Sequence, residues 1–189
     1  MQPFEYLLLF VVIILGLAIG DLATSTQRLL TAGKLVKWDW LAPLAGLVAF
    51  LLTVSQWWDW FGDERIARNI TFPMFLAFLT AAVLLFLVCA TALPDDFGEE
   101  AIDLRVFYAS NARRFWLLFL AHWASTAGAL VWAWISVAHG QLNQAHWAWL
   151  TLPIAAPLVF VKNRWWHGVS LVALAIFYVA PHLGQTLSH

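Results

Sequence analysis

The chain has 189 residues, of which 62% are hydrophobic and only 11% are charged, and its formal net charge is −1. A soluble domain carries about 25% charged residues, because it has to cover its apolar core with a polar surface. The composition therefore excludes a soluble enzyme, a disordered chain and a protein with a basic surface for nucleic acid, and it predicts an integral membrane protein.

Six apolar segments are long enough to cross a membrane as helices, since a hydrocarbon core about 30 Å thick requires about 20 residues. The fifth is the shortest and contains Pro153 and Pro157, which remove helix hydrogen bonds and predict a kink. We therefore expect an all-α, polytopic bundle of six transmembrane helices that forms one membrane domain over residues 1–189. The predicted spans are Phe4–Gly20, Trp40–Trp57, Phe72–Leu93, Phe115–Ala138, Trp147–Val161 and Trp165–Leu183.

Lysine and arginine are distributed unevenly between the two sides of this arrangement. The first, third and fifth loops hold eight of the ten basic residues. Because cytoplasmic loops are enriched in Lys and Arg, these three loops are predicted to be cytoplasmic and both termini to lie on the outer side. The eight residues are Arg28, Lys34, Lys37, Arg105, Arg113, Arg114, Lys162 and Arg164.

Two of the cytoplasmic loops have amphipathic patterns. Residues Asp21–Lys37 mix leucines with Thr, Gln, Arg and Lys, so they either continue the first helix or form a helix at the membrane interface. Residues Glu99–Arg114 begin with acids and end with two arginines, a charge order that suits a helix dipole. This second segment is therefore expected to form an amphipathic helix that leads into the fourth span.

The third loop, residues 94–114, also divides the chain into halves of three spans, 1–93 and 115–189. A Trp-x-Trp-Leu motif starts at Trp38 before the second span and recurs at Trp147 in the fifth, as in an inverted repeat. An aromatic belt is the alternative explanation, because indole rings favour the headgroup region and twelve of the thirteen tryptophans lie at predicted span ends.

Two glycines in the first span, Gly16 and Gly20, form a GxxxG pair that lets a neighbouring helix approach closely. We expect them to pack against another helix of the bundle, and a homodimer contact is the alternative. Asp21 follows directly. An ionisable group at this position is a functional candidate, unless it simply reaches water or an ion pair.

His122 lies about two turns into the fourth span, and Ser125 and Thr126 share its helix face. One interpretation is hydrogen-bonded packing of this face between helices. The other is a proton-relay or substrate site for transport, with Asp21 and Arg114 toward the cytoplasm and the proline-broken fifth span nearby.

No cofactor or metal is predicted. A haem held by His122 and His167, which both lie in the cytoplasmic half, is a minor alternative. Their depths differ by about 7–8 Å, whereas two axial ligands of one iron should lie at nearly equal depth. Histidines on the predicted outer side either sense pH, bind a divalent metal or are solvated loop residues. These are His139, His146, His182 and His189, with Asp59, Asp63 and Glu64 on the same side. The motifs of P-loops, serine hydrolases, zinc proteases and CxxC redox sites are absent, so no catalytic residue is predicted.

Several short segments in roughly the first 120 residues resemble a widespread group of uncharacterised bacterial multi-pass membrane proteins. The resemblance implies a bacterial inner membrane and brings no function with it. The segments are Phe4–Phe10, Ile14–Ala18, Asp21-Leu22, Trp38–Leu41, Asp103–Arg105 and Phe107-Tyr108.

Three functions follow as hypotheses. The leading one is an oligomeric or accessory subunit of a larger membrane complex, whose partners are lipid and either other membrane subunits or a second copy of the chain. The second is a transporter or channel for a small solute, an ion or protons, with its polar site at His122. The third is a haem-binding redox protein.

Overall fold

The computed structural model describes residues 3–61, 71–95, 101–133 and 151–183. This part of the chain is predominantly helical, as predicted. Its long helices are α1 (Pro3–Ala32), α2 (Leu41–Phe61), α4 (Phe72–Ala92), α5 (Leu104–Ala133) and α7 (Arg164–Val179). Its short elements are the 3-10 helices Gly33–Leu35, Ala156–Val159 and Ala180–His182 and the strands β1 (Val36–Lys37) and β2 (Ile102–Asp103).

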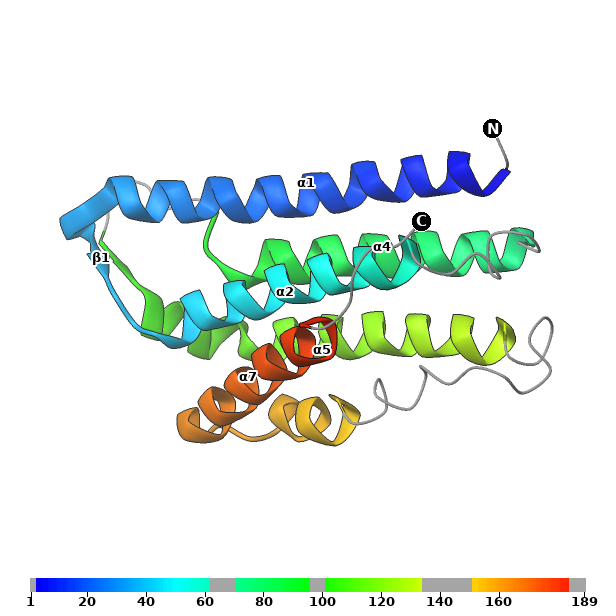
Figure 1. Cartoon of the computed structure of the whole chain (residues 1–189). Helices are drawn as coiled ribbons and strands as arrows, with labels where there is room; N and C mark the ends of the chain where they lie inside the picture. Colours follow the sequence, from blue (N-terminus) through cyan, green and yellow to red (C-terminus); the bar gives the residue numbers. More distant parts are fainter. Residues whose placement is uncertain (1–2, 62–70, 96–100, 134–150, 184–189) are drawn as a thin grey trace.

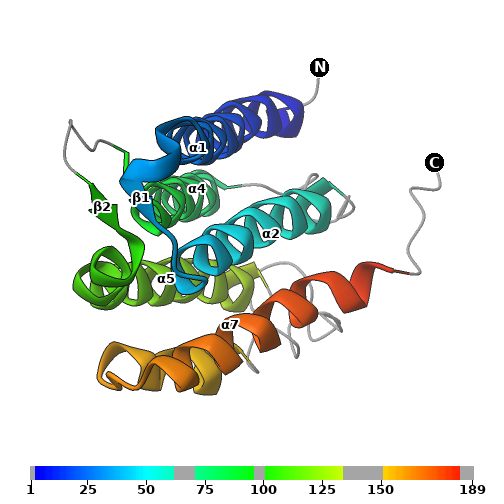
Figure 2. The same cartoon turned by 90° about the vertical axis from the view of Figure 1, so that its left-hand side faces the viewer.

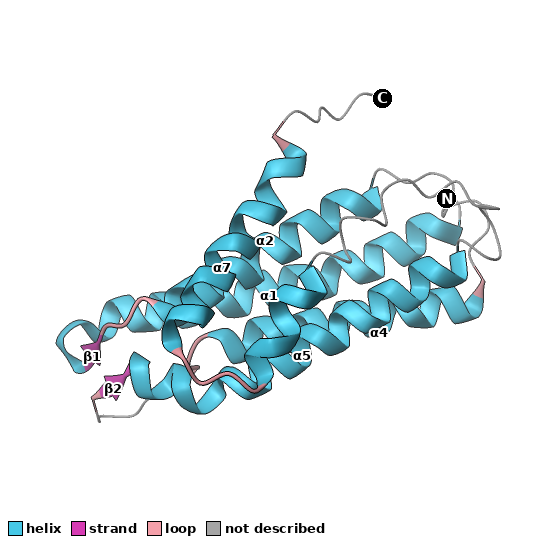
Figure 3. Ribbon diagram, turned by 90° about the horizontal axis from the view of Figure 1, so that it is seen from below, coloured by secondary structure: helices cyan, strands magenta, loops and turns pink. Residues whose placement is uncertain are grey.

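Four of the long helices, α1, α2, α4 and α5, form a bundle in which helices that follow one another along the chain run in opposite directions, so that α1 and α4 run parallel (Figure 1). The central helix is α4, which packs against α1, α2 and α5. The helix α7 packs mainly against α2 and is inclined to the other helices (Figure 3). Both strands lie at one end of the bundle, which we call the strand end (Figure 2).

Three helices of the described chain are long and apolar enough to cross a membrane. The apolar segments are Leu9–Leu35, Leu41–Asp59 and Phe72–Ala92, which overlap the first three predicted spans. Many large apolar side chains of these helices are exposed on the outside of the bundle, as expected for contact with lipid rather than water. The coarse prediction of a helical membrane protein is therefore supported.

The first helix is much longer than the predicted span, because it continues through the first loop to Ala32. Buried side chains recur every three or four residues from Val11 to Leu29, so the polar half of the helix packs with the same face as the apolar residues before it. Gly33 then adopts a positive φ of 52°, which favours glycine, and turns the chain toward β1. Of the two alternatives for this loop, the structure shows a continued helix and no separate interfacial one. The buried positions are Val11, Leu15, Ala18, Leu22, Ser25 and Leu29.

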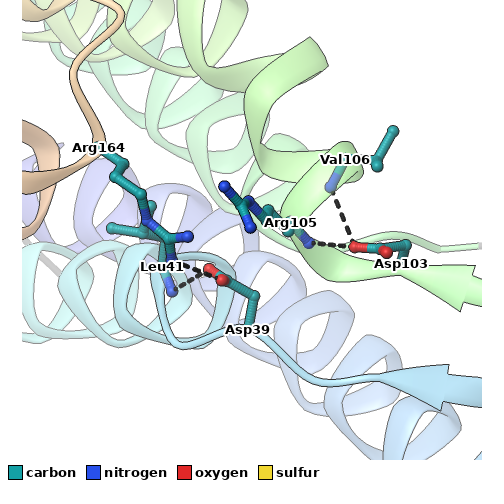
Figure 4. Close-up of polar contacts among 6 residues, drawn as sticks. All are labelled: Asp39, Leu41, Asp103, Arg105, Val106 and Arg164. Carbon is teal, nitrogen blue, oxygen red and sulfur yellow. Dashed lines mark hydrogen bonds and ion pairs between the residues drawn. The ribbon is translucent and has the colours of Figure 1, made fainter.

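The third loop differs from the prediction of one helix over Glu99–Arg114. Ile102–Asp103 is a strand that pairs in parallel with β1, with Val36 opposite Ile102. The helix starts only at Leu104, because the Asp103 carboxylate accepts hydrogen bonds from the backbone N–H groups of Arg105 and Val106, at 3.0 and 3.3 Å (Figure 4). Residues 99 and 100 lie outside the described chain.

The segment before α7 contains two prolines and leaves the α-helical conformation before the end of the predicted fifth span. Residues 151–155 are helical, and a 3-10 helix follows from Ala156 to Val159. The N–H groups of Phe160 and Val161 both donate to the carbonyl of Pro157 and close the turn. Asn163 then caps α7 by accepting a hydrogen bond from the N–H of Trp165 at 3.0 Å. The predicted break at the prolines is therefore confirmed, while residues 147–150 lie outside the described chain.

Candidate functional site

The polar face of α5 forms hydrogen bonds with backbone carbonyls of α4 and of α5 itself. His122 is only 3% exposed, and its Nδ1–H donates to the carbonyl of Ala81 at 2.9 Å. The hydroxyl of Ser125 donates to the carbonyl of Ala77 at 3.3 Å, and that of Thr126 donates to the carbonyl of His122 at 3.0 Å. Each of the three side chains therefore satisfies a backbone carbonyl, two of them across the α4–α5 interface.

The other two members of the predicted transport site lie apart from this face. Arg114 is exposed and lies two turns before His122 on α5, about 12 Å along the helix axis. Asp21 lies on α1, where its Oδ2 atom is buried and accepts no hydrogen bond. Its neighbourhood is polar, because Ser25 donates to the Asp95 carboxylate at 2.6 Å and Arg28 donates to the Asp95 carbonyl. No hydrogen bond or ion pair of the described residues joins Asp21 or Arg114 to His122.

The glycine pair of α1 does not pack inside the bundle. Gly16 and Gly20 are both exposed, and a Cβ atom built at either position has no atom within 4 Å. The buried face of α1 carries Leu15 and Ala18 instead. Among the residues that the structure describes, the expected contact with a helix of the same chain is therefore not found, and the surface that contains these glycines faces outward.

A second buried histidine, His167, forms the most connected polar group of the described chain. It lies in the first turn of α7 and is 4% exposed. Its Nε2 is 2.8 Å from the carbonyl of Val161, so this nitrogen carries the proton and donates it. Its Nδ1 is then the acceptor for the indole N–H of Trp116 at 3.1 Å and the hydroxyl of Tyr108 at 2.9 Å. One neutral imidazole therefore connects α5, the turn after Pro157 and α7.

Burial raises the pKa of the Tyr108 hydroxyl above its ordinary value, because the charged form would lose its hydration. The hydroxyl therefore stays protonated and remains a donor to His167 at physiological pH. Trp116 is fully buried and also contacts Phe115 and Phe119 edge to face. Its predicted place in the aromatic belt is therefore wrong, since its ring belongs to the core.

The sequence contained a weak signal for this network. Tyr108 and Trp116 are eight residues apart, so their side chains lie on neighbouring faces of one helix. Their spacing does not indicate that His167, on another helix, is the hydrogen-bond acceptor of both. The sequence predicts for His167 only the minor role of a haem ligand. Both of its nitrogens are occupied by protein groups, so the ring has none left for a metal. Within the described residues, no group of three or more His, Cys, Asp or Glu side chains is arranged to hold a metal ion.

The corner where α2 and α7 begin is held by an ion pair and a close ring contact. Arg164 donates to the Asp39 carboxylate at 2.6 Å, while the other oxygen of Asp39 accepts the N–H of Leu41 at 3.1 Å (Figure 4). The Trp40 ring lies directly over Gly168, where a Cβ atom would be 2.0 Å from the ring atom Cη2. Glycine is therefore required at this position for Trp40 to pack as it does.

The opposite end of the α2–α7 pair brings together two members of the predicted outer cluster. His182 Nε2 is 3.9 Å from a carboxylate oxygen of Asp59, and its ring lies 6.3 Å from that of Trp58. The other members of that cluster lie outside the described chain. They are His139, His146, His189, Asp63 and Glu64.

No family model, no curated protein and no solved structure matches this chain. The described chain contains densely bonded interfaces between helices and an outward-facing glycine pair.

Proposed function

We propose that this chain is an integral membrane protein that acts as a subunit of a membrane assembly, and that it associates through the outward face of α1 with a second copy of itself. The surrounding membrane is a bacterial inner membrane in this proposal. Six spans cross it, with loops one, three and five in the cytoplasm and both termini outside. The eight basic residues of those loops support this orientation.

The outward glycine face of α1 carries the proposal. α1 lies at the edge of the bundle and packs with one face against α4 and α2 (Figure 2). On the other face Ile13 and Leu17 are exposed, and Gly16 and Gly20 leave the backbone between them uncovered. In lipid, helices associate by close van der Waals contact rather than by the hydrophobic effect, so exposed GxxxG backbone is where a second helix packs best.

The arrangement around His122 weighs against transport as the alternative. A proton relay or a substrate site needs polar groups that remain available to a moving ligand. The side chains of His122, Ser125 and Thr126 instead bond to backbone carbonyls. They therefore support a packing role for this face, as expected for a helix interface in a stable subunit.

The test is the oligomeric state of the full-length chain in lipid nanodiscs or a mild detergent. The double substitution Gly16→Ile and Gly20→Ile places two branched side chains where nothing lies within 4 Å, so the fold itself should tolerate it. We expect the natural chain to be a dimer by light scattering and the double variant to be a monomer.

Gly128 provides a matched control, because it is an exposed helical glycine on α5 with no atom within 4 Å of a built Cβ. The Gly128→Ile variant should remain dimeric. A natural chain that is a monodisperse monomer would refute association through α1. So would a double variant that keeps the oligomeric state of the natural chain.

A further inference from the structure

Large aromatic side chains gather at the strand end, where α2 and α7 begin. Trp165 is 70% and Trp166 is 61% exposed, although both lie in the first turn of α7. Trp40 lies against Trp165 with 6.2 Å between ring centroids. Trp38 and Phe160 are also exposed beside them in the chain, and we call these five residues the aromatic corner.

The aromatic corner is fixed in place by the underlying contacts. Trp40 fits the space left by Gly168, and the guanidinium of Arg164 lies 6.0 Å from the centroid of its ring. Arg164 is held in turn by its ion pair with Asp39. The exposed rings therefore surround a preorganised anchor and do not result from a loosely packed turn.

Positive charge surrounds the same corner. The carboxylate of Asp39 is only 10% exposed and is already used by Arg164 and by the N–H of Leu41. Lys162 is exposed in the turn before α7 and has no ion-pair partner in the described chain. Figure 4 shows the Arg105 side chain extending from the start of α5 toward the Asp39–Arg164 pair. The corner therefore has three cationic groups, Arg105, Lys162 and Arg164, against two acids, Asp39 and Asp103, of which Asp39 is already neutralised by Arg164.

We propose that the aromatic corner binds the headgroups of anionic phospholipids. Indole rings favour the headgroup region, where the apolar ring meets acyl chains and the N–H meets polar groups. Lys and Arg beside them attract the phosphates of an anionic leaflet. Exposed rings on both sides of Lys162 in the chain, with Arg105 reaching toward the Asp39–Arg164 pair, match both parts of such a lipid, which identifies its chemistry as an anionic headgroup with acyl chains.

The opposite end of the same two helices provides an internal comparison. There the aromatic pair Trp57 and Trp58 lies beside Asp59, an acid, and His182. Aromatic rings are thus present at both ends of the α2–α7 pair. Among the residues described, Lys and Arg side chains lie beside the rings only at the strand end. The preference for anionic lipid is therefore assigned to the strand end, where basic side chains accompany the rings.

This inference rests on the membrane location in the proposed function but not on association through α1. The experiment uses the full-length chain in mild detergent with equal amounts of phosphatidylglycerol and phosphatidylcholine, and counts retained lipids by native mass spectrometry. The natural chain should retain phosphatidylglycerol preferentially. The variants Lys162→Gln and Arg105→Gln should each lower that affinity about five-fold, and the double variant about 25-fold, with phosphatidylcholine binding unchanged.

A matched double variant, Lys34→Gln with Arg113→Gln, removes the same charge from exposed positions outside the aromatic corner. It should leave lipid retention unchanged. Equal retention of the two lipids, or equal losses in the two double variants, would overturn the proposal. Displacement of phosphatidylglycerol by millimolar glycerol phosphate would also overturn it, because the corner would then be a site for free phosphate. A chain that is monomeric but selective for phosphatidylglycerol would refute only the proposed association.

Discussion

The two buried histidines show how differently one side chain can be used at two helix interfaces. His122 lies deep in α5 and joins it to a single carbonyl of α4. His167 lies at the start of a helix, yet it accepts from Trp116 and Tyr108 and donates to Val161, so three segments depend on it. The depth of a histidine in an apolar segment therefore indicates burial, but it says little about the number of groups that would lose a partner without it.

Replacing His167 should have the largest effect. His167→Leu leaves the Trp116 N–H, the Tyr108 hydroxyl and the Val161 carbonyl without their partner in a buried site, which should cost about 3–5 kcal/mol of unfolding free energy. His122→Leu removes the partner of Ala81 alone and should cost about 1–2 kcal/mol. Reversible unfolding of both variants in mixed micelles, followed by circular dichroism, measures the difference.

A glutamine at each position sharpens this comparison, because its amide supplies one donor and one acceptor. His167→Gln should recover part of the loss seen with leucine, by accepting from Trp116 while donating to Val161. If His122→Leu proves as costly as His167→Leu, the three-segment role assigned to His167 is incorrect.

Substitution of Gly168, the residue after His167, should have the next largest effect on stability. Gly168→Ala places a methyl group against the rigid ring of Trp40, where it would be 2.0 Å from the nearest ring atom, and overpacking of this kind should cost about 2–3 kcal/mol. The second substitution Trp40→Ala should restore part of the stability by removing the ring. Gly128→Ala serves as the control, since its built Cβ meets nothing within 4 Å. Equal thermal midpoints for the two alanine variants would contradict the described packing of α7 on α2.

Hydropathy alone predicted the helical membrane class and the first three apolar segments, because burial in lipid requires long uninterrupted apolar helices. It left open whether the first helix would continue through the first loop. The continuation to Ala32 depends on protein contacts rather than lipid, since Ser25 and Leu29 are buried and Ser25 bonds to Asp95 of the third loop. The strands were also unpredictable, because two residues such as Val36–Lys37 carry no periodic pattern.

Of the candidate site, the shared face of His122, Ser125 and Thr126 followed from helical periodicity alone. Its partners did not, because Ala77 and Ala81 contribute only backbone carbonyls, and any sequence provides these. Trp116 was misplaced for a related reason. The indole N–H of a tryptophan at a span end can bond either to lipid headgroups or to a buried acceptor. Only the position of His167, on another helix, shows that Trp116 uses a buried acceptor.

The smallest expected effect concerns the hydroxyl of Tyr108. Tyr108→Phe keeps the ring and removes one of two donors to His167, while Trp116 still donates, so the loss should be about 0.5–1.5 kcal/mol near neutral pH. The pH dependence carries the sharper information. Since burial raises the pKa of Tyr108, the unfolded chain releases this proton near its ordinary pKa of about 10 while the folded chain retains it. Stability should therefore fall as the pH rises above about 10, and the Tyr108→Phe variant should show a shallower fall over that range. Identical alkaline slopes for the natural chain and the variant would mean that the hydroxyl is not buried against His167, and the comparison of the two histidines would then rest on Trp116 and Val161 alone.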